Sequence, residues 1–369
     1  AKSLLPVKNG QCFLDIIALQ TIKQGARLLL MNSFSTRQDS LNVLSNHDEL
    51  QGDIPLDFLQ HKIPKVAADD FSPVHFPDEP DLEWCPPGHG DLYISMVTSG
   101  VLESLLKNDY RYAFVSNVDN LGAVLQPSIL GYVVRNELEF LMEVAERTPA
   151  DRKGGHLAKR GDSYILREIA QCPEKDIEHF QNIERHRYFN TNNLWIDLLA
   201  LQQHLQQKEY MPKLPLIVNQ KTVNPRDADS QPVFQLETAM GAAISLFDRS
   251  AAVRVPRTRF APVKSTNDLL LVRSDYYQLN DDYLLVPHPN RACDKVVVDL
   301  DKTYYKMIDD FDTRFPKEVP SMVAARSLQV NGNVVWGKNI RIQGNVQVNG
   351  LESIKKIADD AVLDGTVNL

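Results

Sequence analysis

The chain has 369 residues, of which 43% are hydrophobic and 24% charged, and this composition is typical of a globular protein with a large core. Its formal charge of −8 argues against nucleic acid as a partner, because binding to a polyanion rests largely on neutralised phosphates. No stretch reaches the ~18 apolar residues of a membrane span and the first residues lack the apolar core of a signal peptide, so we expect a cytoplasmic protein with no membrane partner. The cysteines show neither metal-ligand spacing nor a disulfide framework, so we expect reduced thiols at Cys12, Cys85, Cys172 and Cys293.

Short apolar runs of strand type alternate with helical patterns along most of the chain. The expected buried strands are residues 27–31, 112–117, 139–144 and 216–219. The expected helices are residues 92–106, with Asp91 as the N-cap, and residues 236–247. This order predicts the α/β class with a mixed sheet, in which ligands lie beyond the carboxyl ends of the strands.

The tail of the chain repeats every six residues. Two phases of the repeat are aliphatic or aromatic, and they comprise Leu328, Val334, Ile340 and Val346, and Val330, Trp336, Ile342 and Val348. Asparagines and glycines occupy other phases, at Asn333, Asn339 and Asn345 and at Gly332, Gly344 and Gly350. This period predicts a left-handed parallel β-helix. Because the repeat carries no histidine, we interpret it as a structural or assembly module through which homo-oligomers would form.

The most informative segment runs from Trp84 to Asp91, directly before a predicted helix. Gly88 and Gly90 flank His89, so backbone N–H groups can approach a ligand near the positive end of a helix dipole. The alternative interpretation is a tight turn that carries a surface histidine.

A second polar segment, from Asn117 to Gly122, follows the predicted strand 112–117. A carboxylate such as Asp119 at the end of a strand can hold Mg²⁺ against a triphosphate, because Mg²⁺ prefers oxygen ligands and uses one or two carboxylates. The alternative is that Asp119 and Asn120 cap the next helix.

Two lysines and a cluster of asparagines complete the candidates. Lys2 and Lys264 lie in apolar or turn-like surroundings where an unpaired ammonium is costly, so an anion is their natural partner, with a solvated surface lysine as the alternative. The asparagines of residues 189–195 suit sugar hydroxyls, although such clusters also form turns. Residues 153–155, Lys-Gly-Gly, are ordinary turn material and a weak signal.

No Ser-His-Asp or Cys-His arrangement has a recognisable spacing, and no pair of carboxylates indicates glycoside hydrolysis. The candidates instead position phosphates without an evident protein nucleophile. Nucleotidyl transfer suits this set of residues, because a sugar phosphate is itself an anionic nucleophile and catalysis can come from alignment, a metal and lysines.

Taken together, these segments resemble the eukaryotic-type UDP-glucose pyrophosphorylases, or UTP:glucose-1-phosphate uridylyltransferases. The resemblance runs nearly the length of the chain and rests on residues 31–34, 86–91, 117–123, 189–195 and 235–241 and the surroundings of Lys264. It implies a Rossmann-like nucleotidyltransferase domain followed by a left-handed β-helix. We predict a catalytic domain of residues 1–280, a connecting region of residues 281–322 and a β-helix of residues 323–369. The implied reaction joins UTP and glucose 1-phosphate to UDP-glucose and pyrophosphate, with Mg²⁺ as the cofactor.

The resemblance also implies which residues bind the nucleotide. Lys2 would bind the phosphates of UTP, and Gln60 with the backbone at Gly88 would hold uracil. Lys264 would neutralise the transferring phosphate, so Lys2 and Lys264 are the predicted catalytic residues.

A further set would bind the sugar phosphate and the metal. His89 would contact the sugar phosphate, Asn117 both the nucleotide and the sugar phosphate, and Asn192 the glucose. Asp119 would bind Mg²⁺, and residues 153–155 would touch the sugar.

The family begins with a strand and a glycine-rich loop that cradles the nucleotide, and this sequence starts after that loop. We expect the stretch to be omitted from the sequence rather than lost from the protein, because a central strand is hard to lose. Two other functions fit the same residues: a uridylyltransferase for another hexose 1-phosphate, and a non-catalytic protein that binds nucleotide sugars or supports assembly.

Overall fold

A computed structural model describes residues 2–148, 151–152, 154–210 and 212–369. The chain forms two compact units, and each is discontinuous in sequence. The first unit contains residues 1–23, 118–124 and 261–369, and the second contains residues 24–117 and 125–260. The chain passes from the second unit to the first between Asn117 and Val118.

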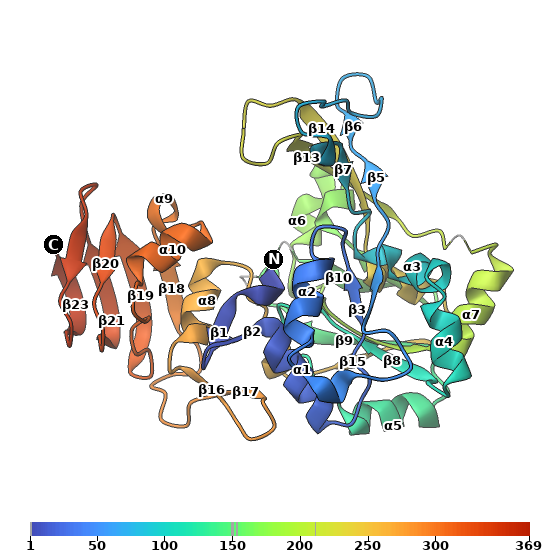
Figure 1. Ribbon diagram of the computed structural model, residues 1–369, viewed down its shortest axis with the longest axis horizontal. Coiled ribbons are helices and arrows are strands. Elements are labelled where there is room, and N and C mark those ends of the chain that lie inside the picture. The colour runs from blue at the N-terminus through green and yellow to red at the C-terminus, as the bar shows by residue number, and fades with distance from the viewer. Residues whose placement is uncertain (1, 149–150, 153, 211) are drawn as a thin grey trace. The chain divides into compact units, whose positions relative to one another are not determined.

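The second unit is built on a mixed six-stranded sheet (Figure 1). Its path is β11-β10-β12-β9-β15, and β8 also pairs with β12. Strands β9 and β15 are parallel and the other pairs antiparallel. The strands are β8 (Tyr112–Val115), β9 (Phe140–Glu146), β10 (His156–Arg160), β11 (Ser163–Arg167), β12 (Tyr188–Asp197) and β15 (Ser250–Arg254).

Helices pack on both faces of this sheet, because successive strand residues point to opposite sides. Phe140 and Met142 of β9 lie in one apolar cluster with residues of α3, α4 and α7. Leu141, between them in sequence, packs instead with Val133 of α5. The helices of this unit are α2 (Arg37–Leu44), α3 (Leu92–Thr98), α4 (Val101–Lys107), α5 (Pro127–Arg135), α6 (Ile177–Phe180) and α7 (Leu198–Gln207). The predicted α/β class with a mixed sheet is therefore confirmed.

Smaller sheets complete the second unit. Strand β3 (Leu30–Asn32) runs parallel to β4 (Asp57–Leu59), and β5 (Ile63–Pro64) pairs with β7 (Trp84–Cys85). Strands β13 (Leu216–Thr222), β14 (Pro232–Thr238) and β6 (Val66–Ala67) form a separate sheet in that order. The short 3-10 helices are η2 (Asp48–Leu50), η3 (Pro80–Glu83), η4 (His89–Asp91), η6 (Ile169–Gln171), η7 (Glu174–Asp176), η8 (Met240–Ser245) and η9 (Arg257–Arg259).

Strands occur at all the predicted places, but three details of the prediction were wrong. Strand β13 was expected to be buried, but Leu216 in it is 52% exposed. The strand lies at the edge of the small sheet, where only one side has a neighbouring strand. The single helix of residues 92–106 is divided into α3 and α4 by Gly100, whose φ of 76° is left-handed. The helix of residues 236–247 is absent, because residues up to Thr238 continue β14 in register with β13 and a 3-10 helix follows.

The first unit contains the repetitive tail. Parallel strands β18 (Val297–Leu300), β19 (Ala325–Asn331), β21 (Arg341–Asn349) and β23 (Val362–Asn368) form one sheet, and parallel β20 (Val334–Trp336) and β22 (Lys355–Ile357) form another. All eight residues of the two aliphatic or aromatic phases of the repeat are at most 2% exposed. Asn331 and Asn349 are hydrogen-bonded to each other on neighbouring strands and lie 18 positions apart in the sequence. Each return of the chain to this sheet therefore takes three hexapeptides.

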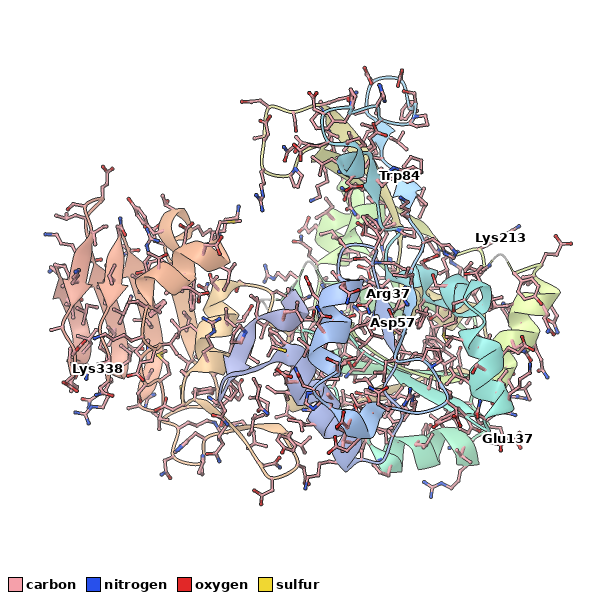
Figure 2. The ribbon with its side chains drawn as sticks, viewed as in Figure 1. Arg37, Asp57, Trp84, Glu137, Lys213 and Lys338 are labelled. Carbon is pink, nitrogen blue, oxygen red and sulfur yellow. The ribbon has the colours of Figure 1, made fainter. Side chains whose placement is uncertain are left out.

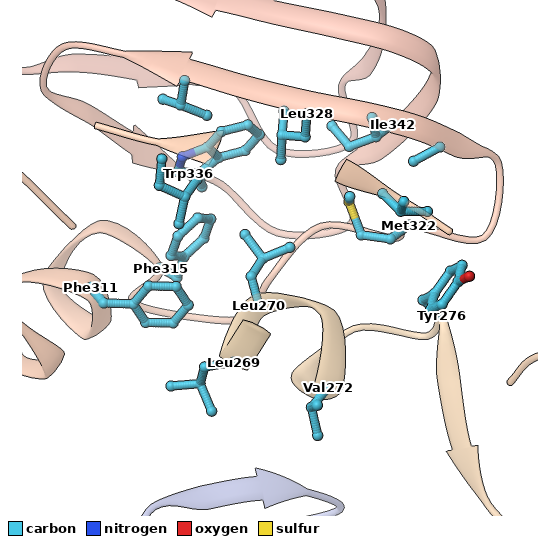
Figure 3. Packing of buried hydrophobic residues seen from close by; sticks show 14 of the residues in the cluster. Leu269, Leu270, Val272, Tyr276, Phe311, Phe315, Met322, Leu328, Trp336 and Ile342 are labelled. Atoms are coloured by element: carbon cyan, nitrogen blue, oxygen red, sulfur yellow. The ribbon is translucent and has the colours of Figure 1, made fainter. Parts of the chain in front are cut away.

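The remaining elements of the first unit are η1 (Lys2–Leu4), β1 (Pro6–Lys8), β2 (Gln11–Cys12), α1 (Phe13–Lys23), α8 (Thr266–Arg273), β16 (Tyr277–Leu279), β17 (Leu285–Pro287), α9 (Lys302–Tyr305) and α10 (Ile308–Arg314). Figure 3 shows how Leu270 of α8 and Phe311 of α10 reach the same cluster as Trp336 and Leu328. Phe315 stacks on Trp336 with ring centroids 5.4 Å apart. Helices and parallel strands of this unit therefore share one hydrophobic core.

Residues 281–322, expected as a connection, contribute β17, β18, α9 and α10 to this core. The division into two units differs from the predicted division into a catalytic domain, a connecting region and a β-helix at residues 280 and 322. Those domain boundaries remain a prediction. All four cysteines are free thiols, as expected. Within the described part of the chain, none of the helices combines the length and apolar character that a membrane crossing needs.

Candidate functional site

The structure brings together two of the predicted residues of the first unit, Lys2 and Asp119. Lys2 lies in η1, and Asp119 lies in the turn at residues 118–119. Lys2 Nζ donates to Asp119 Oδ2 at 2.9 Å, although the residues are 117 positions apart. The side chain of Lys2 is 45% exposed and that of Asp119 only 13%. The ammonium therefore reaches from solvent towards a nearly buried carboxylate.

The second oxygen of the Asp119 carboxylate bears on the predicted metal. Oδ1 of Asp119 is buried and has no hydrogen-bond partner among the residues that the structure describes. An unsatisfied buried carboxylate oxygen is costly, and a cation would relieve that cost. The described residues contain no group of three or more His, Cys, Asp or Glu side chains that would form a complete protein cage. One free carboxylate oxygen fits Mg²⁺ that takes its other ligands from phosphates and water.

Lys264 is tied through the backbone to the segment that carries Asp119. The N–H of Val263 donates to the carbonyl of Asp119 at 3.0 Å, and Ala261 donates to Asn120 Oδ1 at 3.0 Å. Lys264 then precedes Ser265, which caps α8 in a capping box with Asp268. The exposed lysine thus stands at the start of a helix, one residue beyond a buried valine that fixes its backbone.

Gly88 and His89 lie in the second unit, where the chain passes the end of β14. Gly88 has a φ of 82°, and a Cβ there would lie 2.6 Å from the carbonyl oxygen of Thr238. The N–H of Thr238 donates to the carbonyl of Pro87 at 2.9 Å. Only glycine fits this approach, so the segment is held by geometry rather than being an unconstrained surface turn.

His89 is oriented by one backbone contact. The N–H of Met240 donates to its Nδ1 at 2.9 Å. Since Nδ1 accepts, the proton of the neutral ring is on Nε2, which makes that nitrogen a donor towards an anion. Burial lowers the pKa of His89 below its usual value of 6.5, so the ring is neutral at physiological pH.

Gln60 directly follows β4 and is positioned by its neighbours. Its N–H donates to the carbonyl of Asn32 at 2.9 Å. Asn32 Nδ2 also donates to Asp57 at 3.2 Å, and Arg37 forms an ion pair with the same carboxylate, with Nε 2.8 Å from Oδ2. Arg37 and Asp57 are labelled in Figure 2. These contacts fix the end of β4, from which the half-buried Gln60 extends.

Asn192 occupies an irregular point of β12. The register of β12 against β9 shifts between Asn190 and Leu194, and Asn192 has a left-handed φ of 59°. Its side-chain oxygen accepts from Asn190 Nδ2 at 2.7 Å, while its N–H donates to Asn190 Oδ1 at 2.8 Å. A bulge in a strand re-aims a side chain, and asparagine tolerates the left-handed conformation.

The ion pair that supports this bulge was not predicted from the sequence. Arg259 donates through Nε and Nη2 to the fully buried carboxylate of Glu143, at 2.8 and 2.6 Å. Asn193 and Trp195 of β12 donate to the same carboxylate, both at 3.0 Å. The signal was a glutamate inside the apolar run of residues 139–144, because a charge in a buried strand needs a partner.

The two units contain different predicted residues. Lys2, Asp119 and Lys264 lie in the first unit, and Gln60, Gly88, His89, Asn117 and Asn192 lie in the second. Asn117 is half-buried and lies two positions after the end of β8. Of residues 153–155, Lys153 lies outside the described residues. The first set combines two lysines with a carboxylate, and the second combines amides with a histidine and a glycine turn. Groups of these kinds can bind phosphorylated ligands.

Known proteins resemble the whole chain. The sequence profile of the UTP–glucose-1-phosphate uridylyltransferase family matches residues 1–343. The chain is 39% identical to the UTP–glucose-1-phosphate uridylyltransferase of Solanum tuberosum, over 98% of this chain and 76% of that protein. A similar protein of Dictyostelium discoideum is 37% identical over 94% of this chain and 68% of its own length. The chain therefore belongs to the UTP–glucose-1-phosphate uridylyltransferase family.

Solved structures agree. The UDP-glucose phosphorylase of Trypanosoma brucei has a TM-score of 0.91 and 46% identity, and the match covers 100% of this chain and 81% of that one. A UDP-glucose pyrophosphorylase of Leishmania major, solved with UDP-glucose, has a TM-score of 0.90 and 41% identity, over 100% of this chain and 82% of that one. The resemblance found in the sequence motifs is confirmed for the family.

Proposed function

We propose that the protein catalyses the formation of UDP-glucose and pyrophosphate from UTP and glucose 1-phosphate. An oxygen of the sugar phosphate attacks the α-phosphorus of UTP in line with the leaving group. The new P–O bond forms as the bond to the bridging oxygen breaks, and pyrophosphate leaves with the electron pair. No protein nucleophile is needed, so the chain's task is to align two anions and to neutralise their charge.

The observation that carries this proposal is the ion pair of Lys2 and Asp119. A half-exposed ammonium beside a carboxylate with one unpartnered oxygen offers a phosphate both a cation and a metal ligand. Lys2 would hold the phosphates of UTP. Lys264 would neutralise the phosphate that is transferred, from its position at the start of α8.

The residues of the second unit would recognise the base and the sugar. Gln60, anchored through its N–H, would offer its carboxamide to uracil together with the backbone at Gly88. His89 would donate from Nε2 to the sugar phosphate, because Nδ1 already accepts from Met240. Asn117 would contact the nucleotide and the sugar phosphate, and Asn192 the glucose.

Mg²⁺ fits the oxygen left unpaired on Asp119. When bound, the ion would neutralise developing charge on the phosphates, and Asp119 would be its ligand from this chain. The ion pair with Asp119 would also keep the ammonium of Lys2 next to the phosphates of UTP, which Lys2 and the metal on Asp119 would both contact.

The proposal extends to the tail, where the parallel strands and the repeat of 18 residues support a left-handed β-helix. Homo-oligomers formed through this tail, the cytoplasmic location and the lack of nucleic-acid partners remain predictions from the sequence.

The test is an assay of pyrophosphate release from UTP with a panel of sugar 1-phosphates. We expect turnover that is strongest with glucose 1-phosphate and requires Mg²⁺. A preference for galactose 1-phosphate or N-acetylglucosamine 1-phosphate would favour the related uridylyltransferases. Binding of UDP-glucose without turnover would favour a non-catalytic binding protein.

A further inference from the structure

Asp91 stands at the start of α3, where an aspartate ordinarily accepts hydrogen bonds from the first N–H groups of its helix. It makes no such bond. Its carboxylate is directed instead to His61, 30 positions earlier in the chain. The side chain of Asp91 is only 9% exposed. A carboxylate with so little access to water needs hydrogen-bond donors from the protein, and His61 supplies them.

The contact between Asp91 and His61 involves both the backbone and the ring of the histidine. The N–H of His61 donates to Asp91 Oδ2 at 2.7 Å, and His61 Nδ1 lies 2.9 Å from Oδ1. The buried hydroxyl of Ser95 donates to Oδ2 at 2.5 Å, and Thr98 Oγ1 lies 3.1 Å from His61 Nε2. A ring that donates from Nδ1 accepts at Nε2, so all these contacts are satisfied by one tautomer.

His61 directly follows Gln60, so the contact between Asp91 and His61 also restrains the backbone next to Gln60. The N–H of Gln60 donates to Asn32, and the next N–H along the chain donates to Asp91. The backbone on both sides of the Gln60 side chain is thereby fixed. The half-buried carboxamide of Gln60 lies beyond this fixed backbone, where it can meet a ligand.

Asp91 also ends the segment that contains Gly88 and His89. Its N–H donates to the carbonyl of Gly88 at 3.2 Å and closes η4. The other side of this segment is held by Thr238 and Met240. One carboxylate therefore connects the residue after Gln60 to the turn that carries Gly88 and His89.

We propose that Asp91 is a positioning residue that acts through His61 and fixes the distance between Gln60 and Gly88, and so determines affinity and selectivity for uracil. The inference rests on the proposed function of Gln60 and Gly88. Uracil and cytosine differ in the donors and acceptors of one edge, and a glutamine amide free to shift can serve either. A fixed distance between Gln60 and Gly88 therefore favours uracil, and loss of this fixed distance weakens the discrimination against cytosine.

The test is the dissociation constant of UTP and of CTP, measured by calorimetry without sugar phosphate, for Asp91→Asn and for wild type. The amide keeps the volume of Asp91 but cannot accept all three hydrogen bonds, so we expect UTP affinity to fall about tenfold, the scale of losing a charge-assisted hydrogen bond. CTP affinity should fall less, so that the ratio between the two nucleotides narrows at least about threefold.

The matched control is Asp197→Asn. Asp197 is also a buried aspartate, 8% exposed, at the start of a helix, but it caps α7 by accepting from Leu199 and Ala200 and pairs with Arg111. This variant should lower the melting temperature and leave the affinity for UTP unchanged. An equal loss of UTP affinity in both variants would mean that Asp91 acts only through stability, and would overturn the proposal.

His61→Ala removes the ring contact with Asp91 but keeps the backbone N–H that donates to Asp91, so UTP affinity should fall, but less than in Asp91→Asn. The side chain of His61 is 42% exposed, so this variant supplies the test if Asp91→Asn does not fold. The double variant should bind UTP no worse than Asp91→Asn alone, because the ring contact that His61→Ala removes is already lost when the carboxylate is replaced. Additive losses, or unchanged UTP affinity in Asp91→Asn, would overturn the proposal and leave the proposed reaction untouched. Wild type that binds UTP but forms no UDP-glucose would refute the reaction only, and wild type that binds no UTP would refute both.

Discussion

Lys2 Nζ lies 2.9 Å from Asp119 Oδ2, while Oδ1 of the same carboxylate is buried without a partner among the described residues. The two oxygens of Asp119 are thus in different situations, one neutralised by a lysine and one open to a cation. Both situations depend on the negative charge of the carboxylate, which makes this charge the most direct target for a test.

Asp119→Asn should abolish most turnover without unfolding the protein. The amide has nearly the same volume but no charge, so both the pairing with Lys2 and the binding of a metal weaken. Loss of such an electrostatic contact costs about 2 to 3 kcal/mol in the transition state, or about a hundredfold in kcat. Steady-state kinetics at varied Mg²⁺ concentration, with melting temperature alongside, measures this.

Asp275→Asn serves as the control for Asp119, because Asp275 accepts from the Ser321 hydroxyl and the Met322 N–H in the same unit. It should lower the melting temperature and leave kcat unchanged. If Asp119→Asn behaves in the same way, Asp119 has a structural role only and the metal site is wrong.

Lys264→Ala should lower kcat more than it raises KM for either substrate, because a lysine placed on the transferring phosphate contributes mainly in the transition state. Lys264→Arg should rescue poorly, since a planar guanidinium does not replace a compact ammonium. The measurement is steady-state kinetics for both substrates. Lys302→Ala is the control, because Lys302 is also an exposed lysine at the start of a helix, directly after the N-cap Asp301 of α9. A Lys264→Ala variant with kcat within about threefold of wild type would show an ordinary surface lysine.

Gly88→Ala should impair both folding and binding of UTP. A Cβ at Gly88 would meet the Thr238 carbonyl at 2.6 Å, and the left-handed φ of 82° adds strain of roughly 1 to 2 kcal/mol. Gly100→Ala isolates the strain, because Gly100 has a φ of 76° but an added Cβ there would meet nothing within 4 Å. Urea unfolding and UTP titration should show lower stability in both variants and weaker binding only in Gly88→Ala. Equal binding would remove Gly88 from the uracil contacts.

We expect the second unit to lose stability at acidic pH because of the buried His156. Burial, with His186, Arg147 and Arg167 nearby, lowers its pKa from 6.5 to about 3. The unfolded chain therefore binds a proton at higher pH than the folded chain does. The contribution of neutral His156 to stability is fully present above the unfolded pKa of 6.5 and is lost as the pH falls from there towards 3.

Melting temperature measured between about pH 7.5 and pH 4.5 tests this, and the slope should be smaller in His156→Gln than in wild type. His75→Gln is the control, because the side chain of His75 is 83% exposed and its removal should keep the wild-type slope. An identical slope in wild type and His156→Gln would show that another group titrates.

The sequence carried enough local information to predict much of the first unit's tail and the second unit's sheet. The six-residue period identified residues such as Leu328 and Trp336 as buried, because every turn of a repeat places equivalent side chains in equivalent positions. It could not predict that residues 236–238 continue a strand, because their helical pattern is outweighed by hydrogen bonds to β13.

For the candidate site, the sequence by itself determined which residue types stand where: a histidine between glycines, a carboxylate after a strand, and a lysine before a helix cap. These are properties of neighbouring residues, and the family motifs preserve them in order. Only the tertiary structure decided their partners. Asp119 meets a lysine 117 positions away, and Asp91 accepts from His61 rather than from the first N–H groups of the helix that it begins. Contacts between distant residues depend on how the whole backbone folds and leave no local pattern in the chain.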